Sequence, residues 1–137
     1  MSRPGVEHVR AGDRLIAIIV SRAYDPPSTQ FVTSSEANLQ LGFIKYPAGG
    51  VIQEHVHRPI ERHVVGTNEV LLVRYGKMEV LLYDEDRRLA AQRVLGTGDL
   101  LLLMSGGHGF RMLEDTVLVE VKQGPYTGLD EKERFSP

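Results

Sequence analysis

The chain has 137 residues, a formal net charge of −2 and no cysteine. This length predicts one domain, able to bury roughly two-thirds of the surface that the unfolded chain exposes. The near-neutral charge gives no electrostatic basis for binding nucleic acid or an anionic membrane. The absence of cysteine excludes disulfides, thiolate nucleophiles and sulfur-rich zinc sites, so histidine and carboxylate are the only strong metal ligands available.

The start of the sequence carries no basic segment followed by an apolar core, which a secretory signal requires. The longest early apolar run, residues 15–20, is far too short to cross a bilayer. We therefore expect a cytoplasmic protein with no membrane partner.

The first part of the chain predicts short strands separated by turns. Residues 1–12 are polar and turn-rich, which is typical of a loose arm or an edge strand. Residues 15–20 form a continuous β-branched run that predicts a strand buried on both faces. Pro26 and Pro27 end it, because two adjacent prolines cannot lie inside a central strand. Further strands are expected at residues 31–33, 39–46 and 51–57.

The second part of the chain predicts strands joined by tight turns. They are expected at residues 69–75, 77–83, 89–95, 100–104, 108–113 and 116–123. Gly76 separates the first two at a bulge or corner, and a polar tail follows at residues 124–137. No segment of useful length has helical periodicity. Strands and turn signals at this regular spacing predict an all-β barrel or sandwich.

Two histidines and one glutamate are the first candidate metal ligands. His55 and His57 are one residue apart in an expected strand, so their side chains share a face at about 6.6–6.8 Å along the chain. Two such imidazoles can bind one ion, each at about 2.0–2.1 Å if the ion is zinc. Glu69 faces the same side of its strand as two apolar residues, which indicates an inward carboxylate from a neighbouring strand.

Two stretches resemble the two motifs of the cupin superfamily. The residues of the first are Gly49, His55, His57, Glu69 and Gly76, and those of the second are Gly98, Asp99 and the run from Ser105 to Gly109 with His108. Together they span residues 49–112. The resemblance implies one cupin domain over residues 1–137, an antiparallel jelly-roll β-barrel in which His108 supplies a further metal ligand.

The sequence departs from the cupin pattern in two places. Residues 58–68 separate His57 from Glu69, where cupins usually have three or four residues, and Met104 replaces an expected proline. Glu69 keeps the spacing of a glutamate followed, after six residues, by glycine. Glu61 fits the short spacing from His57 but has no such glycine. Glu61 and His63, both in the insertion, are therefore the alternatives to Glu69.

The resemblance also implies what the site does. Three histidines and a carboxylate suit Fe(II), Mn(II), Ni(II), Co(II) or Zn(II), held with one or two positions open to water or substrate. Gln53 lies two residues before His55, so their side chains share a face of the expected strand, and Gln53 is a candidate hydrogen-bond donor to substrate. Phe110 and Met112 share the face of His108 and would form an apolar wall of the site. No catalytic residue is assigned.

Two classes of function follow for such a site. One is a small metalloenzyme, dioxygenase-like or isomerase-like, that acts on a small polar molecule. The other is a non-catalytic cupin in which a metal is structural or anchors a ligand. The arrangement is also similar to small stand-alone cupins of bacterial polysaccharide and sugar-nucleotide pathways, which implies a sugar-derived ligand.

Two expectations concern the outer surface. Residues 15–20, 70–73 and 100–103 are apolar at successive positions, and one barrel buries only one face of each strand, so we expect a homodimer. Glu120 and Lys122 share a face of the last strand, which favours a solvated cross-strand pair over a role in the interior.

Overall fold

The computed structural model describes residues 5–128 and 131–137, and it is an all-β structure in which every paired strand is antiparallel. Within the described residues there is no α-helix, and no helix is long and apolar enough to cross a membrane. The strands are β1 (Val6–Ala11), β2 (Arg14–Val20), β3 (Gln30–Phe31), β4 (Gly42–Phe43), β5 (Glu69–Tyr75), β6 (Lys77–Tyr83), β7 (Leu89–Gly96), β8 (Leu100–Leu103), β9 (Gly107–Met112) and β10 (Val117–Lys122).

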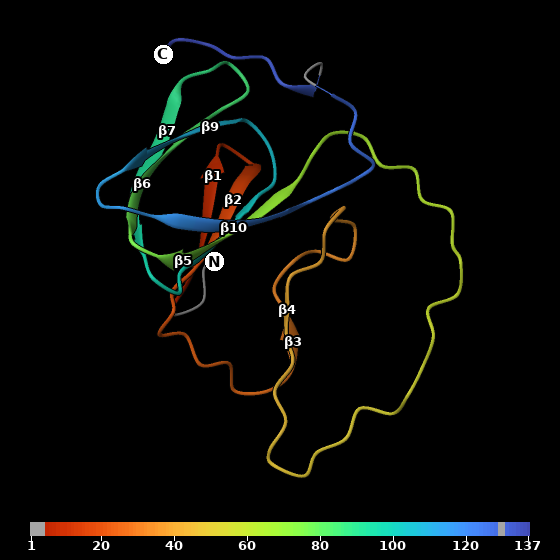
Figure 1. Cartoon of the computed structure of the whole chain (residues 1–137). Helices are drawn as coiled ribbons and strands as arrows, with labels where there is room; N and C mark the ends of the chain where they lie inside the picture. Colours follow the sequence, from red (N-terminus) through yellow and green to blue (C-terminus); the bar gives the residue numbers. More distant parts are fainter. Residues whose placement is uncertain (1–4, 129–130) are drawn as a thin grey trace. The chain divides into compact units, whose positions relative to one another are not determined.

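The chain forms two compact units. The first, here called the sheet unit, combines Met1–Tyr24 with Thr67–Pro137, and the second is Asp25–Gly66. The sheet unit holds a five-stranded sheet in the order β1-β2-β8-β5-β10 and a three-stranded sheet in the order β7-β6-β9 (Figure 1). The Asp25–Gly66 unit holds only the short pair β3-β4.

The two larger sheets share one apolar core. Strands turn alternate side chains to opposite faces, and the inward residues of the two sheets meet in a single cluster. Its members include Ala17, Ile19, Leu71, Val73, Leu101 and Leu103 from the five-stranded sheet and Met78, Val80 and Leu82 from the three-stranded sheet. This core holds β5 and β9, and therefore Glu69 and His108, in fixed registers.

The expected strands of the sheet unit are confirmed with small shifts at their ends. Residues 1–12 contain the edge strand β1, one of the two interpretations of that segment. The strand at residues 15–20 is buried on both faces, as predicted, since the successive residues Ala17 and Ile18 point to opposite faces and are both fully buried.

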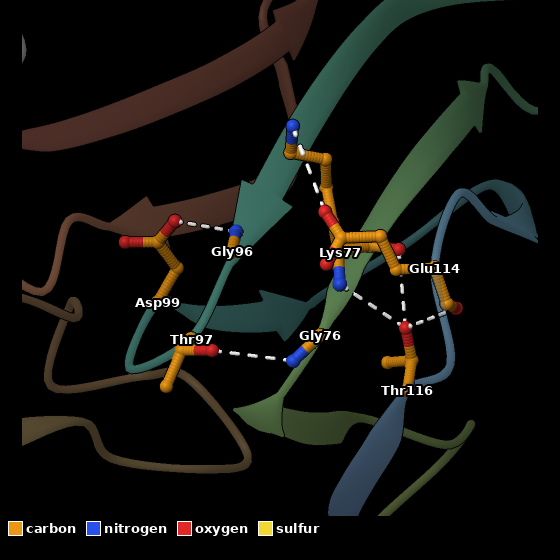
Figure 2. A network of polar contacts seen from close by, with 7 residues as sticks. All are labelled: Gly76, Lys77, Gly96, Thr97, Asp99, Glu114 and Thr116. Carbon is orange, nitrogen blue, oxygen red and sulfur yellow. Dashed lines mark hydrogen bonds and ion pairs between the residues drawn. The ribbon is translucent and has the colours of Figure 1, made fainter.

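Gly76 makes the corner between β5 and β6 (Figure 2). Its φ is +105°, and a Cβ there would collide with the Thr116 side chain, so only glycine fits. The Gly76 N–H donates to the Thr97 hydroxyl at 3.2 Å, and the Lys77 N–H donates to the Thr116 hydroxyl at 3.1 Å. Asp99 accepts from the Gly96 N–H at 2.8 Å in the neighbouring turn. These contacts join the ends of both sheets at the predicted corner.

The outer faces of the strands differ in exposure. Leu102 is fully buried, whereas Leu72 and the valines of β10 are exposed on the outer face of the five-stranded sheet. Of the three apolar runs that predict a homodimer, only residues 70–73 therefore keep apolar surface exposed on the chain. The homodimer stays a prediction.

The Asp25–Gly66 unit differs most from expectation. The strand expected at residues 39–46 shrinks to Gly42–Phe43, which pairs with Gln30–Phe31. The strand expected at residues 51–57 is wrong, because this segment is an irregular, exposed trace without strand pairing (Figure 1). An extended segment becomes a stable strand only when a neighbour accepts and donates its backbone hydrogen bonds, and the sequence pattern does not supply that neighbour.

Candidate functional site

Glu69 is the first residue of β5 and lies on the inner face of the five-stranded sheet with Leu71 and Val73, as predicted. The preceding residue, Asn68, fixes this end of the strand. Its side-chain amide donates to the Met104 carbonyl at 2.8 Å, and its backbone N–H donates to the Gln123 side chain at 2.6 Å. The start of β5 is therefore tied to the strands on both sides of it.

His108 approaches Glu69 from the other sheet. In β9, His108 pairs with the buried Leu82, and the next inward residue, Phe110, packs against the core. The His108 Nε2 lies 3.7 Å from the Glu69 Oε2, which is too long for a hydrogen bond but places the two groups side by side. The Phe110 ring stacks on the imidazole with centroids 5.4 Å apart. Met112 shares this face but is half exposed.

Two charged residues of β10 complete the surroundings of Glu69. Lys122 is its direct partner in the register, and Glu120 is one position further along the same face, opposite Leu71. The Glu120 carboxyl lies near enough to raise the pKa of Glu69, whereas the Lys122 ammonium pairs with Glu131. Lys122 therefore pairs with Glu131 and not with Glu120, while Glu120 is exposed to solvent.

The buried position of Glu69 and the partly buried position of His108 change the acid–base properties of both groups. Burial, and then the adjacent Glu120 carboxyl, raise the pKa of Glu69 to about 7. Burial also lowers the pKa of His108 below its ordinary value, with Glu120 opposing and Lys132 adding to the shift. These shifts favour the neutral form of the His108 imidazole, and they keep part of the Glu69 carboxyl protonated near neutral pH.

The raised pKa of Glu69 predicts that the metal-free protein loses stability as the pH rises. Below about pH 4.5 this carboxyl is protonated in both the folded and the unfolded chain. Between pH 4.5 and about 7 this carboxyl is ionised in the unfolded chain but keeps its proton in the folded chain. The free energy of unfolding of the wild-type protein therefore falls over this range. We expect urea unfolding at several pH values to show that the free energy of unfolding of Glu69→Gln rises relative to that of wild type, by on the order of 2 kcal/mol, between pH 4.5 and 7.5.

The exposed Glu61→Gln is the matched control for this comparison, since its carboxyl is on the surface. Its stability difference from wild type should not follow the same profile. If the difference in unfolding free energy between Glu69→Gln and wild type stays constant over this pH range, the raised pKa of Glu69 is contradicted.

The remaining candidates lie in the Asp25–Gly66 unit. The His55 and His57 rings are adjacent, with centroids 5.2 Å apart, and the His55 Nδ1 lies 2.8 Å from the Gln53 carbonyl oxygen. The Gln53, Glu61 and His63 side chains are exposed, in segments without strand structure. The structure thus brings together Glu69 with His108 in one unit and His55 with His57 in the other. In the described part of the chain, no three His, Asp or Glu side chains gather as a metal-binding group.

The sequence pattern did not predict a role for Asn68, and it favoured a solvated position for Glu120 over a role in the interior. Asn68 showed no signal, because an asparagine before a strand is common and its partners Leu103, Met104 and Gln123 are far from it in the sequence. Glu120 had a usable signal, since a glutamate that alternates with apolar residues shares their face. The sequence pattern does not show that this face of the last strand lies beside Glu69.

Comparisons with known proteins add no assignment. No protein-family model matches the chain, and neither a curated protein nor a solved structure is significantly similar to it.

Proposed function

We propose that the protein is a small metal-binding cupin, a jelly-roll barrel that binds one divalent ion through His55, His57, Glu69 and His108. In this proposal it is a dioxygenase-like or isomerase-like metalloenzyme that acts on a small polar or sugar-derived molecule. The observation that carries the proposal is the approach of Glu69 and His108. These residues come from different sheets, and both turn inward at one end of the core.

The donor atoms fit a divalent ion. Two ligands of one ion, each about 2.1 Å from it, are about 3.0–3.4 Å apart at octahedral or tetrahedral angles. The His108 Nε2 and Glu69 Oε2 are 3.7 Å apart, so a shift of a few tenths of an ångström would complete that geometry. A cation would also offset the repulsion between the Glu69 and Glu120 carboxyl groups.

The residues of the chain have separable roles in this proposal. His55, His57 and His108 donate neutral nitrogen lone pairs, and Glu69 donates a carboxylate oxygen. The Phe110 ring holds the imidazole of His108 in one orientation by stacking on it. A bound ion would supply a Lewis acid, or oxygen activation if it is iron.

Metal binding by the wild-type protein tests the proposal. We expect about one divalent ion per chain when protein purified without added metal is analysed for its elements and then titrated with Mn(II), Fe(II), Co(II), Ni(II) and Zn(II). His108→Ala should lose this ion, and Glu79→Gln, a carboxyl variant on β6 that pairs with Arg111, should keep it. Wild-type protein that binds none of these ions would reject the proposal.

The non-catalytic alternative has one observation in its favour. Glu120 adjoins Glu69 and is a further oxygen donor, and a site closed by protein ligands is typical of structural ions. Water-proton relaxation of the Mn(II)-loaded protein separates the two. Rapidly exchanging water on the ion supports an open, catalytic centre, and its absence supports the binding protein.

A further inference from the structure

Lys122 is placed to neutralise Glu69, yet it does not. It is the direct cross-strand partner of Glu69 in the pairing of β10 with β5, so both side chains are on the inner face. Opposite charges at directly opposed positions of an antiparallel pair attract and commonly bond each other. Here, however, the basic side chain nearest to the Glu69 carboxyl is His108, whose Nε2 lies 3.7 Å from the Glu69 Oε2.

Glu131, in the C-terminal segment, binds Lys122 instead. The Lys122 Nζ is 2.9 Å from the Glu131 Oε1, and only about a quarter or less of either side chain is exposed. The other carboxylate oxygen of Glu131 accepts a hydrogen bond from the Thr127 hydroxyl. Glu131 is therefore held by two partners, and it fixes the direction in which the Lys122 ammonium points.

The position of this ammonium decides which bonds Glu69 can form. A carboxylate that accepts from an ammonium must break that ion pair before its oxygens can bind another cation. Lys122 still acts on Glu69 through space, but it forms no bond to it. Glu69 thus has no bond to the Lys122 ammonium, although the nearby Lys132 also acts through space on both Glu69 and His108.

We propose that Glu131 is a positioning residue for the Glu69–His108 site, because it binds the Lys122 ammonium and prevents that ammonium from pairing with Glu69. The inference rests on the proposed function, since the cation that Glu69 would bind in place of Lys122 is the proposed metal ion. It assigns a role to the C-terminal segment, which the sequence predicts only as a polar tail.

Calorimetric titration with Mn(II) or Zn(II) tests the inference with four variants. In Glu131→Gln, Lys122 is free to pair with Glu69, and we expect the metal to bind about tenfold more weakly, at the lower end of the range for partners that orient a metal ligand. Lys122→Met removes the competing ammonium and should bind at least as tightly as wild type. The double variant Lys122→Met/Glu131→Gln should return to within about twofold of wild type.

Glu133→Gln is the matched control. It makes the same substitution in the same segment, but Glu133 pairs with Arg87, away from Lys122. Its metal affinity should equal that of wild type. Thermal melting of each metal-free variant checks that all four remain folded.

The outcomes separate this inference from the proposed function. An unchanged affinity in Glu131→Gln, or a double variant as weak as Glu131→Gln, would overturn the inference while wild-type metal binding still supports the proposed function. Absence of metal binding in wild type would overturn both. A crystal structure of metal-free Glu131→Gln gives a readout without metal, since the inference requires the Lys122 Nζ within hydrogen-bond distance of the Glu69 carboxyl.

Discussion

His55→Ala and His57→Ala are each expected to weaken divalent-metal binding by about 100-fold or more. Loss of a residue that merely orients a ligand costs about 10–100-fold, so loss of a ligand itself should reach at least the upper end of that range. The metal content of each variant, measured beside wild type after the same dialysis, checks this result. Wild-type metal content in both variants would remove the adjacent histidine pair from the site.

Both histidine variants should keep the fold. The core is built from the two larger sheets, and neither histidine belongs to it. A chain with its own core does not depend on an ion to fold, unlike a small zinc finger. Urea unfolding of the metal-free variants should therefore match that of wild type. His63→Ala, a third exposed histidine of the same unit, is the control and should retain both fold and metal.

Glu69→Gln should lower metal binding strongly, whereas Glu61→Gln and His63→Ala should not. Glu69 has the buried, inward position and the neighbouring imidazole that a ligand needs. Glu61 and His63 are exposed residues in an irregular segment. The amide of glutamine keeps the size of the side chain but removes its charge, so a loss of metal would reflect ligation rather than packing.

Metal content after identical dialysis decides between these carboxyl groups. Retention in Glu69→Gln, together with loss in Glu61→Gln or His63→Ala, would reassign the ligand to the insertion at residues 58–68. It would also weaken the case for an open catalytic centre, because Glu69 and His108 would then lack a common ion.

The sequence by itself determined most of the sheet unit. The strands after residue 68 follow each other through short turns, and alternation alone predicts the inward face of each strand. Their pairing is less local, since β5 pairs with β8 and β10 and β9 pairs with β6. Glu69 and His108 are examples of the predicted inward face. Each alternates with apolar residues, and each turns inward as predicted. Gly76 was predictable as a corner for a similar local reason.

Only the tertiary structure decided what each inward group meets. The segment at residues 51–57 has the pattern of a strand, but a strand also needs a neighbour for its backbone hydrogen bonds, and it forms none here. The partner of Lys122 is likewise set by a distant segment, since Lys122 pairs with Glu131 rather than with Glu69 opposite it. Alternation fixes the face of a side chain, whereas its bonds depend on residues that the fold brings from elsewhere.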